Sequence, residues 1–167
     1  MSIFFVDKKR HFIYFDPRKN IFNEVFNMRL ELFFHFDGNC REAVDFYAKV
    51  FRTEVRNLMT YGNTPTDPSH PTPDCDKNRI IYSGLLLDNM TAMFSDVPSG
   101  SGFKAGNNIS PTISTNDKDE VRRIFNELSD GGEVYFDLAP TFFSELFGMV
   151  TDKFGIHWQI LFYEEKE

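Results

Sequence analysis

The chain has 167 residues, enough to bury a core as one domain or as two small modules. Charged residues make up 26% and hydrophobic residues 41%, as is usual for a globular protein. The net charge of -7 leaves no basic surface for phosphates, so we expect no nucleic-acid partner. Twenty phenylalanines are unusual and predict thick packing between sheet and helix, or an aromatic-lined pocket.

The two cysteines, Cys40 and Cys75, have neither the spacing of a disulfide framework nor that of a C-x-x-C motif. No apolar run approaches the length of a membrane span, and the charged residues 7–10 interrupt the short apolar start of the chain. We therefore expect a cytoplasmic protein without a membrane partner.

Residues 1–27 are expected to form an N-terminal extension outside the main domain. Two stretches, Ile3–Val6 and His11–Phe15, predict short strands, and residues 17–20 predict a turn. The extension is either a short added hairpin or an upstream segment that precedes a start at Met28.

The first regular pattern begins with residues 29–36, which predict a strand. Asn39, with Glu42 three positions later, predicts a capped helix that ends near Phe51. The proline-rich residues 62–78 predict a polar loop that is mobile or lies over the surface, where it would serve as a lid. Three further strands are expected at residues 53–61, 79–87 and 90–95.

A similar pattern follows the glycine- and serine-rich linker 98–106. Asp117 and Glu120 predict a second capped helix, which ends near Leu128 and buries one apolar stripe. That stripe is Val121, Ile124, Phe125 and Leu128. The expected strands are residues 108–115, residues 133–138 and the two arms of a hairpin over residues 147–162.

The second arm of this hairpin alternates between two kinds of side chain. His157, Gln159 and Leu161 share one face, and Trp158 and Ile160 share the other. We expect the face with Trp158 in the core and the face with the polar pair along a cavity.

The order strand, helix and three strands therefore occurs twice, in residues 29–95 and in residues 108–163. One helix covers only one side of each sheet, so the other sides are left to curl around a ligand. The predicted fold class is α+β, with a single domain over residues 28–163 in which two βαβββ modules form curved mixed sheets around a cavity.

Five motifs carry a resemblance to a known family. They are G-N-C-R-E-A-V-D-F-Y at residues 38–47, M-T-Y-G at 59–62, G-N-N at 106–108, T-F-F at 141–143 and F-G-M-V-T-D-K-F-G at 147–155. They closely resemble the PhnB-like branch of the glyoxalase/bleomycin-resistance superfamily, also called the vicinal oxygen chelate fold. Some relatives carry a 3-demethylubiquinone-9 3-methyltransferase label. The resemblance covers about residues 29–163 and implies paired βαβββ modules and a homodimer.

Metal-dependent members of this superfamily hold a divalent ion with up to four side chains, from the first and last strands of both modules, and use it as a Lewis acid. By the resemblance, these positions fall on Leu32, near Phe94, near Ser110 and on Gln159. Leucine and phenylalanine cannot bind a metal, and serine is a poor ligand. We therefore expect no metal site, and a metal, if present, would be held by Gln159 with His157.

The residues expected to line the ligand cavity are Tyr61, Ser110, Thr141, Phe142, His157 and Gln159. His157 either binds a metal or acts as an acid/base residue, or it lines the cavity with its hydrogen bond satisfied.

Other candidates have simpler expected roles. His35 is expected to pack near the helix or at a dimer contact rather than to bind a ligand. The proline-rich loop also contains four possible metal ligands, His70, Asp74, Cys75 and Asp76. Their spacing matches no standard zinc pattern, so we expect a solvated acidic loop rather than a metal cluster. Asp152 is expected to cap a turn.

Two functions fit these observations. The first is a cytoplasmic homodimer that binds an apolar or aromatic small molecule without metal. The alternative is a divalent-metal-dependent lyase, isomerase or dioxygenase acting on a small oxygenated substrate. No catalytic residue is assigned, and the sequence has no strand followed by a glycine-rich turn and helix of the kind that holds an adenosyl cofactor.

Overall fold

A computed structural model describes residues 3–6, 12–16, 21–24, 30–65, 68–69, 71–88 and 90–164. The chain divides into two compact units, Met1–Glu31 and Leu32–Glu167. The first unit holds an antiparallel sheet in which β2 lies between β1 and β3. Its strands are β1 (Ile3–Val6), β2 (Phe12–Asp16) and β3 (Ile21–Glu24). The first two occupy nearly the expected residues, whereas the third was not predicted.

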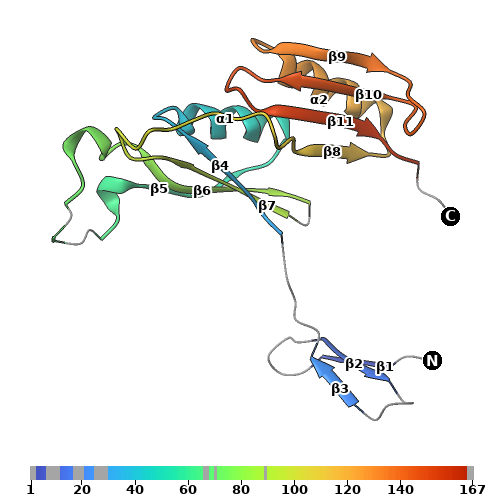
Figure 1. Ribbon diagram of the computed structural model, residues 1–167, viewed down its shortest axis with the longest axis horizontal. Helices are drawn as coiled ribbons and strands as arrows, with labels where there is room; N and C mark the ends of the chain where they lie inside the picture. The colour runs from blue at the N-terminus through green and yellow to red at the C-terminus, as the bar shows by residue number, and fades with distance from the viewer. Residues whose placement is uncertain are drawn as a thin grey trace. The chain divides into compact units, whose positions relative to one another are not determined.

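The second unit contains two modules, each running strand, helix and three strands (Figure 1). Module 1 consists of β4 (Leu32–Phe36), α1 (Cys40–Val50), β5 (Val55–Thr60), β6 (Ile80–Leu87) and β7 (Met90–Asp96). Module 2 consists of β8 (Thr112–Thr115), α2 (Lys118–Ser129), β9 (Glu133–Ala139), β10 (Phe147–Thr151) and β11 (His157–Phe162).

Each module forms its own four-stranded mixed sheet. Sheet 1 has the order β4-β7-β6-β5, and sheet 2 has the order β8-β11-β10-β9. In both sheets the first and last strands of the module pair in parallel, and the remaining pairs are antiparallel. The predicted α+β class with two mixed sheets is confirmed.

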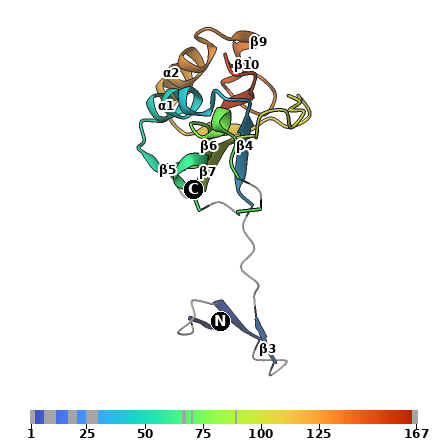
Figure 2. The same cartoon turned by 90° about the vertical axis from the view of Figure 1, so that its left-hand side faces the viewer.

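The two modules share one hydrophobic core. Helices α1 and α2 lie side by side, and each packs on the inner side of its own sheet (Figure 2). The predicted stripe of α2, from Val121 to Leu128, is buried and belongs to the same cluster as Phe34, Phe94 and Trp158. Among the described residues, no helix is both long and apolar enough to cross a membrane.

Asp152 joins the two modules at the centre of this core and is only 3% exposed. Its Oδ2 accepts hydrogen bonds from the Tyr47 hydroxyl of α1 and from Trp158 Nε1 of β11, both at 2.7 Å. Its Oδ1 accepts from the backbone N–H groups of Phe154 and Ile156, at 2.8 and 3.0 Å. Burial, together with this carboxylate, raises the pKa of Tyr47. The predicted turn-capping role is therefore confirmed, and the link to module 1 is an addition to it.

The start of α1 differs from its prediction. The Asn39 side chain makes no capping hydrogen bond. Instead, the buried Asp96, at the end of β7, accepts from the backbone N–H groups of Gly38 at 2.8 Å and Cys40 at 3.0 Å through Oδ1. Its Oδ2 accepts from Ile80 N at 2.8 Å. A carboxylate more than fifty residues away therefore caps this helix, because Gly38, at a φ of 95°, turns the chain toward it.

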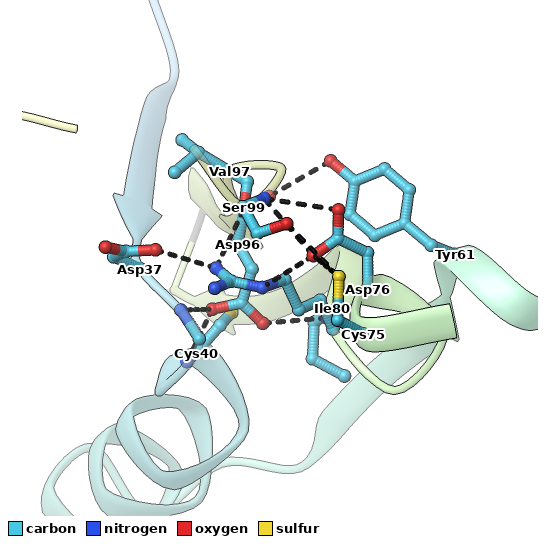
Figure 3. A network of polar contacts seen from close by, with 11 residues as sticks. Asp37, Cys40, Tyr61, Cys75, Asp76, Ile80, Asp96, Val97 and Ser99 are labelled. Atoms are coloured by element: carbon cyan, nitrogen blue, oxygen red, sulfur yellow. Dashed lines mark hydrogen bonds and ion pairs between the residues drawn. The ribbon is translucent and has the colours of Figure 1, made fainter. Parts of the chain in front are cut away.

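The segment that was expected to be a mobile or draped loop is fixed at its base (Figure 3). It contains two 3-10 turns, η1 (Tyr61–Asn63) and η2 (Asp74–Asp76). Arg79 binds Asp37 at 2.8 Å and Asp76 at 3.0 Å, and Asp76 also accepts from the backbone N–H of Ser99. Asp76 is 2% exposed, so the solvated-loop interpretation was wrong for this residue. His70 lies outside the described residues.

The side of each sheet that faces away from its helix is called its open face below. In β4, Phe34 and Phe36 are buried against the helix side, whereas Phe33 and His35 are exposed on the open face. In β11, Trp158 and Ile160 are buried, and His157 and Gln159 lie on the open face, as predicted. The helix sides of both sheets contribute to the shared core, and the two hollows described below are lined by residues of module 2 and of the linker before it.

Candidate ligand-binding site

The open face of sheet 2 combines polar and apolar side chains in one register. The hairpin of β10 and β11 places Thr151 opposite His157 and Met149 opposite Gln159. The parallel neighbour β8 places Thr112 beside Gln159. Partners in a register share a face of the sheet, so these five side chains form one patch.

A hollow of about 240 Å³ opens at one end of this patch. Its wall comes from the linker before β8 and from β9, β10 and β11. The lining residues are Asn107, Ser110, Tyr135, Met149, Val150, Thr151, His157 and Trp158. None of them is Asp, Glu, Lys or Arg, so the hollow offers hydrogen bonds and apolar surface without a fixed charge.

His157 is the most versatile group in the hollow. Its Nδ1 lies 2.9 Å from the Thr151 hydroxyl, which either donates to it or accepts from it. When the hydroxyl donates, Nε2 carries the proton and becomes a donor; in the other tautomer Nε2 is an acceptor. The pair therefore matches a ligand carbonyl in one state and a ligand hydroxyl in the other.

The residues expected around the cavity fall into three places. Ser110 and His157 line the hollow, and Gln159 lies on the same open face without lining it. Thr141 and Phe142 line a second hollow of about 400 Å³ beside the β9–β10 link. Tyr61 belongs to module 1, where its hydroxyl donates to the Asp96 carbonyl at 3.1 Å (Figure 3).

Burial, followed by the charges of Asp76 and Asp96, raises the pKa of Tyr61. This hydroxyl is therefore a donor within the module 1 network rather than a group directed at the hollow in module 2.

Sequence reasoning missed Asn107, Tyr135, Met149, Val150 and Thr151 as lining residues, and it expected Trp158 only in the core. The hairpin prediction contained the signal for two of them. A turn over residues 152–156 places Thr151 opposite His157 and Met149 opposite Gln159. Tyr135 and Asn107 depend on long-range placement of β9 and of the linker, which no local pattern provides.

The open face of sheet 1 carries a similar pair of polar side chains. His35 Nδ1 lies 3.0 Å from the Ser95 hydroxyl, and the His35 ring stacks on Phe33 with centroids 4.8 Å apart. The expectation that His35 packs near the helix was wrong, because the strand turns this side chain away from α1. The alternative of a dimer contact stays a prediction.

A family model described as 3-demethylubiquinone-9 3-methyltransferase matches residues 28–161. The chain belongs to this family. It is similar to protein YjdN of Escherichia coli K12, with 26% identity over 140 residues that make up 80% of this chain and 94% of the relative. The relationship to PhnB-like proteins of the glyoxalase/bleomycin-resistance superfamily is confirmed.

Solved structures show the same fold. Protein PA1353 from Pseudomonas aeruginosa superposes with a TM-score of 0.75 and 27% identity, over 83% of this chain and all of that chain. A structure from Bacillus cereus described as a putative 3-demethylubiquinone-9 3-methyltransferase, PhnB protein, superposes with a TM-score of 0.67 and 23% identity. It covers 81% of this chain and all of its own.

The metal site of the superfamily does not fit the residues of this PhnB-like chain. Leu32 and Phe94, which were aligned with two ligand positions, lie on the helix side of sheet 1, where Phe94 is buried. The open-face neighbours are Phe33 and His35 in β4 and Met93 and Ser95 in β7.

On module 2 the corresponding open-face groups are Ser110 and Gln159, both neutral and weak donors. In the described residues there is no group of three or more His, Cys, Asp or Glu side chains arranged to hold a metal ion. No chemical step is therefore derived through a metal.

The described residues also form no cofactor site that matches the methyltransferase description of the family. A phosphate- or adenosyl-binding turn between strand and helix needs several glycines so that the backbone can approach the cofactor. The turn between β4 and α1 is Asp37-Gly38-Asn39, and the turn between β8 and α2 is Asn116-Asp117. Asp96 already occupies the N–H groups at the first of them.

Proposed function

We propose that this PhnB-like protein binds a small, neutral, aromatic or apolar molecule in the hollow on the open face of module 2. The observation that carries the proposal is the composition of the hollow. Met149 and the largely exposed Tyr135 supply apolar surface, and Ser110, Thr151 and His157 supply hydrogen-bonding groups. Ligand sites commonly combine an apolar wall with a few convergent polar groups.

The charge of the surroundings favours a neutral ligand. The chain carries a net charge of -7, and no lysine or arginine lines the hollow. An anion would therefore lose its hydration without gaining a counter-charge. An aromatic ligand with one hydroxyl or carbonyl matches both the apolar wall and the His157 Nε2.

The single tryptophan provides the test, because Trp158 borders the hollow. We use 4-nitrobenzyl alcohol, a neutral aromatic quencher, and 4-nitrobenzoate, its anionic counterpart. The alcohol should quench Trp158 fluorescence saturably and bind at least about tenfold more tightly than the carboxylate, a difference of about 1.4 kcal/mol.

Two substitutions locate the binding. His157→Ala should weaken binding of the alcohol about tenfold, as expected when a hydrogen bond and part of the wall are lost. The matched control is Tyr163→Ala, which removes an aromatic ring from the second hollow and should leave binding within about twofold. Equal loss in both variants, or tighter binding of the carboxylate, would contradict the proposal.

The proposal includes no bound metal. Protein purified without chelator should contain well under one equivalent of Zn, Ni, Mn or Fe. About one equivalent per chain, lost in Gln159→Ala, would instead favour the divalent-metal-dependent lyase, isomerase or dioxygenase.

We also propose that the chain acts as a homodimer in the cytoplasm. The resemblance to PhnB-like proteins supports the dimer, and the two free cysteines, Cys40 and Cys75, are consistent with a reducing compartment.

A further inference from the structure

The second hollow, beside the β9–β10 link, combines aromatic rings with carboxylates. Its volume is about 400 Å³, a size common among small-molecule sites. Glu145 and Glu164 supply negative charge, and the described residues that line the hollow include no Lys or Arg. Four aromatic residues complete the wall: Phe142, Phe143, Phe162 and Tyr163. The hollow around His157 has no charged lining residue, so the two hollows suit different ligands.

The rings of the second hollow have uncovered faces. Phe142 is 99% exposed, and Phe143 and Tyr163 are exposed as well. Phe142 and Phe143 stand edge to face, with an angle of 86° between the rings and centroids 5.0 Å apart. The face of an aromatic ring carries partial negative charge and attracts a cation. Rings set at different angles therefore offer contacts to one cation from more than one side.

Hydrogen bonds hold the link that carries two of these rings in one shape. Thr141 N donates to the Ser144 carbonyl at 2.8 Å, and Ser144 N donates to Thr141 Oγ1 at 3.1 Å. The buried Ser144 hydroxyl lies 2.7 Å from the Phe162 carbonyl, which ties the link to the end of β11. The walls of the hollow are thus positioned before any ligand arrives, so binding orders little of the chain.

Lys118 provides an independent sign that this surface holds an ammonium group. Its Nζ lies 4.7 Å from the centroid of the Phe162 ring and forms an ion pair with Glu145. One ring face and one carboxylate therefore already surround a cation at the edge of the hollow. The Lys118 side chain is 40% exposed and belongs to the first turn of α2, so it is free to turn into solvent.

The rings and the carboxylates together favour one kind of cation. A metal ion or a primary ammonium group is strongly hydrated, and an aromatic wall does not replace that water. A trimethylammonium group presents methyl groups that spread its charge over an apolar surface, and aromatic sites bind such groups. The two glutamates repel anions.

We propose that the second hollow binds a small organic cation that carries a trimethylammonium group. The ring faces contact its methyl groups, and Glu164 lies beside the charge. Glu145 joins Glu164 when Lys118 turns away. This site is separate from the neutral-ligand site proposed above, and all its residues come from one chain.

A pair of isosteric probes tests the proposal. Choline carries the trimethylammonium group, and 3,3-dimethylbutan-1-ol has a neutral carbon in place of the nitrogen. In the nitrogen-15-labelled full chain, the amide signals of residues 141–145 and 161–164 should shift saturably with choline. The expected dissociation constant is about 1 mM, at least about fivefold lower than for the alcohol. Equal affinity for both probes, or shifts elsewhere only, would overturn the proposal.

Three substitutions locate the cation. Phe142→Leu keeps the apolar bulk but removes the ring face, and Glu164→Gln keeps the shape but removes the charge. Each should weaken choline binding about three- to fivefold. Lys118→Met frees Glu145 and Phe162 and should tighten binding about threefold, an effect that structural damage would not produce.

Matched controls remove the same groups from other exposed positions. Phe103→Leu lies in the linker between the modules, and Glu54→Gln lies between α1 and β5. Both should change the constant by less than about 1.5-fold. Equal losses in controls and hollow variants would show that choline follows the overall negative charge, and weaker binding in Lys118→Met would also overturn the site. Quenching of Trp158 by 4-nitrobenzyl alcohol reports the His157 hollow separately.

Discussion

The two modules have the same order of elements and strands, yet they use their polar residues differently. In module 1, Asp37, Asp76, Asp96 and Arg79 bind one another or backbone groups that come from distant parts of the chain. In module 2, the helix start is capped locally by Asp117, and His157 and Gln159 remain on an open sheet face. Module 1 thus uses its buried Asp76 and Asp96 to hold distant segments of the chain together, whereas the helix start of module 2 depends on a local cap.

The largest expected effect comes from Asp96→Ala. It leaves the buried backbone N–H groups of Cys40 and Ile80, and the part-buried N–H of Gly38, without an acceptor, and it should lower the free energy of unfolding by about 3 to 5 kcal/mol. Urea unfolding followed by Trp158 fluorescence measures this change. Asp74→Ala is the control, because this exposed carboxylate pairs with Lys77 at the surface and its loss should cost less than about 0.5 kcal/mol.

A second readout follows the start of α1 directly. Burial, together with Asp96, raises the pKa of the Cys40 thiol to about 12, so native Cys40 should resist thiol reagents at pH 8 while the exposed Cys75 reacts. Asp96→Ala should accelerate Cys40 labelling. A loss of less than about 1 kcal/mol with unchanged labelling would show that Asp96 does not hold module 1 together.

Tyr47→Phe tests the connection between the modules. The variant keeps the aromatic ring in the core but removes the hydrogen bond from the Tyr47 hydroxyl to the buried Asp152 carboxylate. The expected loss is about 1 to 2 kcal/mol by urea unfolding, because a bond to a charged acceptor is lost. Tyr135→Phe, on an exposed ring, should be neutral, and an equally neutral Tyr47→Phe would refute the connection.

The smallest expected loss of stability distinguishes the local cap of α2 from the distant cap of α1. Asp117→Ala removes a side chain that accepts from Asp119 N and Glu120 N, and it should cost about 1 kcal/mol. Asn39→Ala occupies the matching position in α1, where the side chain makes no capping bond, and should cost less than about 0.5 kcal/mol. Equal losses in thermal or urea unfolding would contradict the difference between the modules.

These helix starts also show what the sequence predicts and what it does not. The cap by Asp117 was predictable because donor and acceptor lie within three residues. The Asn39 pattern had the same form, but Asp96 took its role through a contact across more than fifty residues, which local spacing cannot reveal. The link from Asp152 to Tyr47 was missed for the same reason, and the burial of Asp76 depends on its contact with Ser99, which lies in a later loop.

The candidate site was predictable where it depends on strand alternation. The alternation in β11 placed His157 and Gln159 on one face correctly, because the hairpin keeps a regular register there. Leu32 and Phe94, the metal-ligand positions implied by the resemblance, lie on the helix side of sheet 1, because successive residues of a strand point to opposite faces. Tyr61 lies elsewhere because its hydroxyl bonds the distant Asp96 carbonyl at the end of β7, and Thr141 lies in the β9–β10 link, where it bonds Ser144.

Methyl NMR tests most directly whether module 2 holds the ligand. Met149 lines the hollow and is the one methionine of module 2, whereas Met59, Met90 and Met93 belong to module 1. With carbon-13 on the methionine methyl groups, titration with 4-nitrobenzyl alcohol should shift the Met149 signal most strongly, and His157→Ala should weaken that response about tenfold. A response of the module 1 methionines with an unchanged Met149 signal would contradict the assignment of the site.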